Sequence, residues 1–112
     1  MPEINPIPDP TRVAEKASKP RFDLIAPHFL LGLARGLTTG AKKHGERTYL
    51  KYPRKHYVAA LHRHINAYQQ GESIDTDEVT GDVNTHLALA GCCIMILSEM
   101  DRLGIDTEDD NG

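Results

Sequence analysis

THLALAGCCIMILSEMDRLG, residues 85–104, is the stretch that decides the fold of this 112-residue chain. Every residue from Leu87 to Leu97 is apolar or small, so a helix here would be apolar nearly all round, as central, buried helices are. Gly104, shortly after Arg102, is a typical helix ending. Three polar residues could cap its start: Asp82, Asn84 and Thr85. The stretch therefore predicts a buried helix around which the other elements pack.

Two more stretches have the apolar spacing of helices. Residues 26–45, APHFLLGLARGLTTGAKKHG, have Pro27 in the first turn and Gly45 as a stop, and residues 54–71, RKHYVAALHRHINAYQQG, end at Gly71. In the first of them glycine recurs every four residues on one face: Gly32, Gly36 and Gly40. Each helical glycine costs about 0.5–1 kcal/mol against alanine, so this face predicts the close approach of another helix or of a ligand.

No alternating strand pattern stands out, so we predict an all-α fold, a small bundle of three to four helices. The helical domain spans residues 21–104, the usual size of a single domain. Before it, residues 1–20 hold five of the seven prolines and are expected to form an extended arm, with at most one helical turn over residues 11–17. After it, residues 105–112 form an acidic tail. Because two other helices cover an all-round apolar helix poorly, we also expect a homo-oligomer.

The cysteine and hydropathy patterns favour a reducing, aqueous compartment. Cys92 and Cys93 are the only cysteines; as neighbours in an apolar helix they are expected to be reduced, buried thiols. No run of about 18 apolar residues is present, so no membrane span is predicted. The first residues lack the basic start and apolar stretch of a secretory signal. We therefore expect a cytoplasmic protein.

Charge is distributed unevenly along the chain. Residues 21–70 carry nine bases against two acids, a net charge of +7, whereas residues 71–112 carry eleven acids against Arg102 alone, a net charge of −10. A basic half beside an acidic half suits a site that binds phosphates on one side and a divalent cation on the other. The alternative is that the two halves neutralise each other in the fold or lie in charged tails.

Residues 71–86, GESIDTDEVTGDVNTH, carry five carboxylates and end in His86. Glu72 and Asp75 lie three residues apart just past a helix, so both could meet one Mg²⁺ or Mn²⁺ ion if the chain is helical there. His64 lies on or beside the apolar stripe of the preceding helix, and a hairpin could bring it next to His86. The alternatives are a solvated acidic loop and a core histidine satisfied by its neighbours.

Basic side chains gather in residues 40–51, GAKKHGERTYLK. Lysines and arginines that cluster among small residues can hold phosphate oxygens, although an ordinary solvated face is the alternative. The chain has no Gly-rich GKS or GKT phosphate loop, no GxGxxG and no GxSxG nucleophile elbow. Any phosphate chemistry must therefore use helix-borne side chains.

Several of these motifs, in this order, resemble one known family. Residues 21–47 (RFDLIAPHFLLGLARGLTTGAKKHGER), 63–75 (RHINAYQQGESID) and 80–90 (TGDVNTHLALA) resemble the phage-associated dATP/dGTP diphosphohydrolase N-terminal domain family. That family is similar to the all-α MazG-like pyrophosphohydrolases, which hold Mg²⁺ with helix-borne carboxylates and cut a nucleoside triphosphate into monophosphate and pyrophosphate. The chain departs from the pattern at Leu89, where the family has a second histidine, and it lacks the E-x-x-E half of the MazG motif.

The resemblance implies a Mg²⁺-dependent hydrolase of purine deoxynucleoside triphosphates, dGTP or dATP. By position it implies three catalytic residues: Glu72, Asp75 and His64. It implies metal ligation by the same three and by His86, and substrate binding by three bases: Lys43, Arg47 and Arg63. The two departures favour the alternative, a catalytically silent phage accessory or nucleotide-binding protein of the same fold. Nucleic-acid binding is disfavoured, because the acidic half would repel a duplex.

Overall fold

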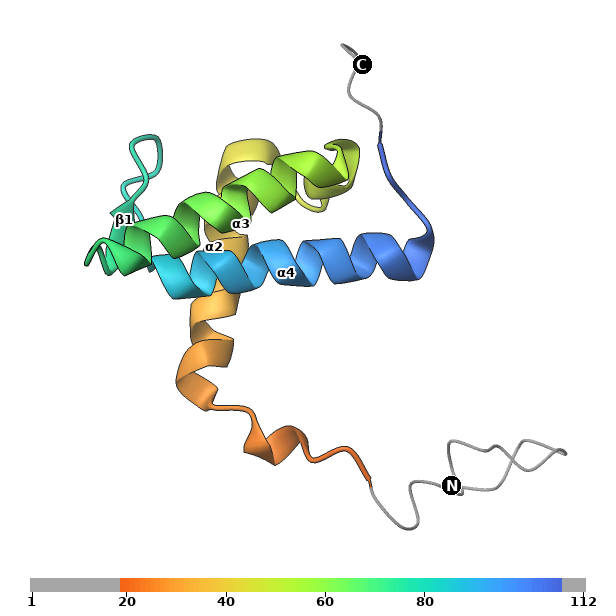
Figure 1. Cartoon of the computed structure of the whole chain (residues 1–112), viewed down its shortest axis with the longest axis horizontal. Helices are drawn as coiled ribbons and strands as arrows, with labels where there is room; N and C mark the ends of the chain where they lie inside the picture. The colour runs from red at the N-terminus through yellow and green to blue at the C-terminus, as the bar shows by residue number, and fades with distance from the viewer. Residues whose placement is uncertain (1–18, 108–112) are drawn as a thin grey trace, which may run out of the picture.

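The computed structural model describes residues 19–107 (Figure 1). In chain order its elements are η1 (Phe22–Leu24), α2 (Pro27–His44), η2 (Thr48–Lys51), α3 (Arg54–Gln69), β1 (Ile74–Thr76), β2 (Val83–Thr85) and α4 (His86–Leu103), where η1 and η2 are short 3-10 helices. The three predicted helices are thus confirmed as α2, α3 and α4. The helical turn expected over residues 11–17 lies outside the described residues, as do most of the proline-rich arm and residues 108–112 of the acidic tail.

α3 and α4 lie side by side and run in opposite directions, and α2 crosses behind them (Figure 1). Tyr57 of α3 packs with Ile96 and Met100 of α4, and Met100 is fully buried. Burying a side chain of this size contributes about 1.5–3 kcal/mol. This contact joins the start of α3 to the second half of α4. Because the two helices run in opposite directions, the end of α3 lies beside the start of α4, where the predicted site residues are.

Glycines let α2 approach α4 closely, as the predicted glycine face required. A Cβ added at Gly36 would lie 2.8 Å from the sulfur of Cys92, and one added at Gly32 would lie 3.1 Å from a side chain of α4. A Cβ added at Gly91 of α4 would likewise lie 2.8 Å from the side chains of Leu33 and Phe29 of α2. A Cβ at Gly40, in contrast, would meet nothing within 4 Å. The glycine face thus serves helix packing along most of its length and leaves open space at its end.

The prediction of a purely helical fold is wrong for one segment, residues 71–86. β1 and β2 form an antiparallel hairpin in which Asp75 lies opposite Asn84. Gly81, with a φ of 79°, supplies the left-handed turn residue that closes the loop. Each strand is only three residues long, too short for the alternation that identifies a strand in sequence.

Both ends of α4 are fixed by local contacts. Of the three candidate caps, Thr85 is the one used: its Oγ1 accepts a hydrogen bond of 3.1 Å from the backbone N–H of Ala88. Gly104 ends the helix in the left-handed conformation, with a φ of 67°. Beyond it, the carboxylate of Asp106 accepts from the backbone N–H of Arg54 at 3.0 Å. The first residues of the predicted tail therefore pack against the start of α3.

One face of α4 stays open in the single chain. Ile94 is 56% exposed and Leu87 is 44% exposed. η1 and the start of α2 project away from the helix pair (Figure 1), and they carry exposed apolar side chains of their own. These are Phe22, Leu24, Phe29, Leu30 and Leu31. The chain thus leaves uncovered the apolar surface that motivated the prediction of a homo-oligomer.

The other face of α4 buries both cysteines. Cys92 and Cys93 are free thiols, as predicted. Burial raises the pKa of Cys92 to about 11 and also raises the pKa of Cys93. Both therefore stay protonated and unreactive at neutral pH. None of the helices within residues 19–107, α4 included, is long and apolar enough to cross a membrane.

Candidate functional site

The end of α3 and the start of α4 bring the two predicted histidines into contact. The Nδ1 atoms of His64 and His86 lie 3.0 Å apart, and the ring centroids are 5.3 Å apart. His86 is buried and His64 is half-buried. Since two protonated nitrogens cannot share such a contact, one imidazole donates its Nδ1–H and the other accepts. The sequence hypothesis that a hairpin pairs these residues is confirmed.

The hairpin that pairs them begins with a tight reversal of the chain. Gly71 has a φ of 94°, and the N–H of Glu72 donates back to the carbonyl of Ala67 at 3.0 Å. The N–H of His86 then donates to the carbonyl of Ser73, also at 3.0 Å. These backbone bonds place the carboxylates of β1 and the preceding turn beside the start of α4.

Glu72 and Asp75 both lie beside this histidine pair. Oε1 of Glu72 is 3.9 Å from Nε2 of His86, although the Glu72 side chain is 68% exposed. Asp75 is half-buried, and its negative charge acts to raise the pKa of His64. Glu72 thus lies near the His86 ring and the charge of Asp75 reaches the His64 ring, so the four residues form a linked group.

Burial keeps His64 neutral at physiological pH. Desolvation is the largest cause that lowers its pKa, followed by the charge of His86 and, more weakly, of Arg63; Asp75 opposes them. A His64 imidazole with a lowered pKa is uncharged at neutral pH and can accept a proton. This is the protonation state that a general base requires.

The group offers oxygen ligands for Mg²⁺ but no complete cage. Within the part of the chain that the structure describes, no three His, Cys, Asp or Glu side chains are close enough together to hold an ion by themselves. Mg²⁺ commonly keeps several waters and binds through one or two carboxylates plus substrate phosphates. Glu72 and Asp75 are carboxylates of the type that such an ion takes, whereas the Nδ1 atoms of the histidines are occupied by each other.

The lysines of α2 are held by the acids of the hairpin loop. Nζ of Lys43 lies 2.8 Å from Oδ1 of Asp77, and Nζ of Lys42 lies 3.0 Å from Oδ2 of Asp82. Lys43, together with a backbone hydrogen bond from Thr80, lowers the pKa of Asp77 to about 2. Part of the opposite charge of the two halves is thus neutralised within the fold, which was the alternative interpretation of the charge pattern.

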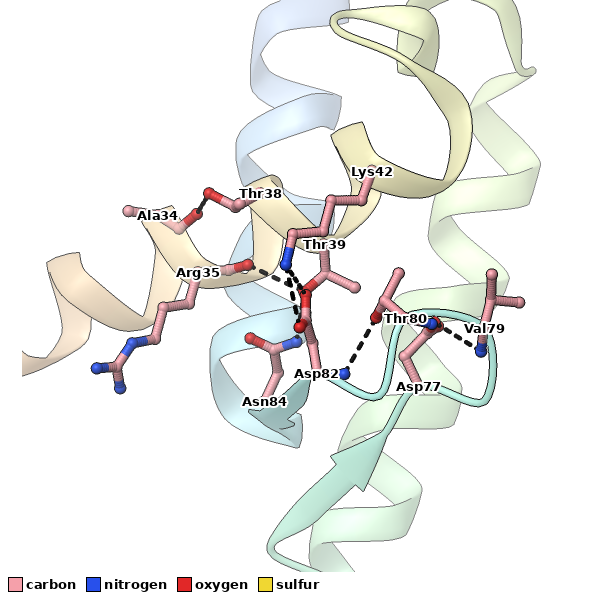
Figure 2. A network of polar contacts seen from close by, with 10 residues as sticks. All are labelled: Ala34, Arg35, Thr38, Thr39, Lys42, Asp77, Val79, Thr80, Asp82 and Asn84. Atoms are coloured by element: carbon pink, nitrogen blue, oxygen red, sulfur yellow. Dashed lines mark hydrogen bonds and ion pairs between the residues drawn. The ribbon is translucent and has the colours of Figure 1, made fainter.

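A polar network around Thr39 completes this contact, and no sequence pattern predicted it. Thr39 donates to Asp82 at 2.8 Å and accepts from the buried amide of Asn84 at 3.0 Å, while Lys42 closes on the same carboxylate (Figure 2). The side chain of Asp77 accepts from the N–H groups of Val79 and Thr80 and shapes the loop (Figure 2). Thr39 and Lys42 are 40 to 45 residues away in sequence from Asp82 and Asn84, so only the fold reveals that they are in contact.

Arg47 and Arg63 lie in different places. Arg63 is exposed on α3, and its charge reaches both His64 and Cys93. Arg47 follows α2 and has a φ of 59°, a left-handed backbone that residues other than glycine rarely adopt. It lines a recess of about 450 Å³ between α2, α3 and α4. Arg63 therefore lies close enough to the histidine pair for its charge to act on His64, whereas Arg47 lines a separate recess.

Comparison with known proteins gives one match. The model of the family described as dATP/dGTP diphosphohydrolase, N-terminal, matches residues 9–110 of the 112-residue chain. Neither the curated proteins nor the solved structures give a match. The match runs through the recess, both histidines, both candidate carboxylates and all of α4.

Proposed function

The chain belongs to the dATP/dGTP diphosphohydrolase N-terminal family, and from that premise we propose that it hydrolyses purine deoxynucleoside triphosphates to monophosphate and pyrophosphate. The observation that carries the proposal is the linked group of His64, His86, Glu72 and Asp75 at the junction of α3 and α4. Residues 22 positions apart in sequence form one polar group there, beside surface that a substrate can reach.

We assign Mg²⁺, or Mn²⁺, to the two carboxylates. Glu72 and Asp75 would hold it together with the substrate phosphates and water, and one or both imidazoles would complete the site or orient the carboxylates. A bound divalent cation neutralises phosphate charge and makes a coordinated water a better nucleophile. The high exposure of Glu72 suits a ligand that closes on the ion only when the nucleotide arrives.

We assign the general base to His64. Nε2 of His86 points toward the carboxylate of Glu72, so that nitrogen is the natural position for the His86 proton. His86 then accepts at Nδ1, His64 donates its Nδ1–H, and Nε2 of His64 is left free to accept a proton. The lowered pKa of His64 keeps that nitrogen available at neutral pH. It would take the proton of the attacking water.

Arg63 and Lys43 would bind the polyphosphate, and Arg47, which lines the separate recess, would contact another part of the nucleotide. Arg63 is exposed next to His64 and is free to approach phosphate oxygens at the site. Lys43 forms an ion pair with Asp77, so it would have to release that carboxylate before it could bind a phosphate. Stabilising the charge that develops on the leaving pyrophosphate is the expected contribution of such groups.

The test is incubation of the protein with dGTP or dATP and Mg²⁺, with release of monophosphate and pyrophosphate as the readout. Absence of turnover by cleanly folded protein would remove the enzymatic proposal. The second candidate function, nucleotide binding without hydrolysis, is favoured by Leu89 in place of a family histidine and by the lack of a three-ligand group among residues 19–107. Tight binding of dGTP with no product formed would establish it.

We propose that a second copy of the chain covers the open face of α4. Ile94 and Leu87 expose apolar surface on one helix, which monomeric proteins usually cover or use for association. Sedimentation or light scattering is expected to give a dimer or larger assembly, and Ile94→Glu is expected to shift it toward the monomer. A monomer at every concentration of the unmodified chain would refute this part.

A further inference from the structure

A recess separate from the histidine pair lies between the end of α2, the turn after it, the start of α3 and the middle of α4. Its volume is about 450 Å³, within the ~300–1,000 Å³ typical of small-molecule sites. Small and apolar residues form its floor: Gly36, Gly40, Ala41, Met95 and Ile96. Because a Cβ at Gly40 would meet no atom within 4 Å, that part of α2 faces open space.

Aromatic rings form one wall of this recess. The rings of Tyr52 and His56 are stacked, with centroids 5.0 Å apart and planes 22° apart. His44 and Tyr57 meet Tyr52 edge-on, with centroids at 6.2 and 6.4 Å. All four line the recess. Flat aromatic faces of this kind bind bases by stacking.

The rim carries one acceptor and one donor side by side. Glu46 and Arg47 are consecutive, exposed and in the lining of the recess. The left-handed backbone of Arg47 is the kind of strain that clusters at ligand sites. Guanine presents the matching pattern, with N1–H and N2–H₂ donors for a carboxylate and O6 and N7 acceptors for a guanidinium.

We propose that this recess binds the guanine base of a nucleotide. The base lies against the aromatic wall that contains the stacked rings of Tyr52 and His56, Glu46 accepts from N1–H and the N2 amino group, and Arg47 donates to O6 or N7. Adenine fits less well, because it has a donor in place of O6 and lacks the N2 amino group. That the guanine belongs to a triphosphate rests on the proposed function; that a guanine nucleotide binds here does not.

The position of the recess agrees with one substrate serving both sites. Tyr57 and His64 are seven residues apart on the same face of α3, which is about 10 Å along the helix axis. A sugar and its phosphate chain cover such a separation.

The test measures binding of dGMP, dAMP and dCMP by calorimetry to the full chain and to two leucine variants. Gly40→Leu fills the recess from a position with no neighbour within 4 Å, so the fold should tolerate it. Ala59→Leu adds similar bulk on the exposed surface of α3, outside the recess. We expect dGMP to bind most tightly, Gly40→Leu to weaken it at least tenfold, and Ala59→Leu to leave it unchanged.

Glu46→Gln tests the choice of base. It is expected to reduce the preference for dGMP over dAMP by about tenfold or more, since one well-placed polar pair contributes ~1–3 kcal/mol of discrimination. As a check independent of any variant, dGMP should shift the NMR signals of the His44 and His56 rings and leave the ring signals of His62, which lies outside the recess, in place.

Two results would overturn the proposal: unchanged dGMP affinity in folded Gly40→Leu, or dAMP binding as tightly as dGMP. The outcomes also separate it from the proposed function. If dGMP binds in the recess but dGTP is not hydrolysed, the hydrolase fails and the recess stands. If dGTP is hydrolysed with the same KM in Gly40→Leu as in the unmodified chain, the recess fails and the hydrolase stands.

Discussion

The acidic hairpin contains two kinds of carboxylate that look alike in sequence. Asp77 and Asp82 are held by lysines of α2 and by hydrogen bonds, and their pKa values are lowered as a result. Glu72 and Asp75 lie at the other end of the hairpin, beside two imidazoles, and no lysine or arginine of residues 19–107 forms an ion pair with either. The first two attach the hairpin to α2. The second two retain the capacity to bind a cation.

The largest expected effect that tests this division is on turnover. Glu72→Gln should lower the rate of dGTP hydrolysis at least about a hundredfold, because the loss of a single group around a metal site already costs 10–100-fold. Glu78→Gln makes the same change at the exposed loop, away from the histidines, and should keep the rate within about twofold. Equal rates in both variants would mean that the two ends of the hairpin do not differ in function.

The next effect is on stability and concerns the other end. Asn84→Ala removes the amide that donates to Thr39 inside the buried network, and should lower the free energy of unfolding by about 1–3 kcal/mol. Glu72→Gln should change it by less than about 0.5 kcal/mol, as surface substitutions usually do. Urea unfolding followed by circular dichroism measures both. A larger loss in Glu72→Gln than in Asn84→Ala would reverse the assignment.

A pH effect follows from the lowered pKa of Asp77. A carboxyl group whose pKa is lower in the folded chain contributes stability above its unfolded pKa, and that contribution disappears as the pH falls through the folded value. The stabilities of the unmodified chain and of Lys43→Met should therefore differ above about pH 4 and converge near pH 2. Carboxyl NMR titration should show the pKa of Asp77 rising toward its ordinary value in Lys43→Met. A low pKa that persists in this variant would show that Lys43 is not its cause.

The smallest expected effect is on the titration of His64. Burial and the neighbouring His86 lower its pKa, so the folded chain releases this proton below the ordinary histidine pKa. The neutral imidazole contributes stability above about pH 6.5, and this contribution decreases as the pH falls. His86→Gln should raise the pKa of His64 only in part toward its ordinary value, because desolvation, the larger cause, remains. Imidazole proton NMR measures the shift, and no rise in His86→Gln would mean that the two rings do not interact in solution.

Much of the fold could be predicted because local patterns specify it. The apolar spacing, Pro27 in the first turn and the glycine stops defined three helices to within a few residues. The glycine face predicted a close crossing, and Gly36 against Cys92 is that crossing. The hairpin was missed because three-residue strands carry no detectable period, and the contact that holds Asn84 of β2 is made by Thr39 of α2, far away in sequence.

The candidate site was predicted in part for a related reason. His64 and His86 flank a reversal of the chain, so a hairpin between two helices could bring them near each other, and in the structure it does. The partners of Lys42 and Lys43 could not be predicted, since any of five carboxylates in the hairpin was equally available in sequence. Neither could the recess, because its wall combines rings from α2, the turn before α3 and α3 itself.

The sequence by itself determined three helices, two buried thiols, a chain of opposite charge in its two halves and two histidines that a hairpin could bring together. These follow from interactions within a few residues of each other, where spacing and backbone preference decide. Only the tertiary structure decided which carboxylates neutralise lysines and which remain beside the imidazoles. Charge attraction has little directional preference at long range, so the crossing of α2 over α4 selects the pairs.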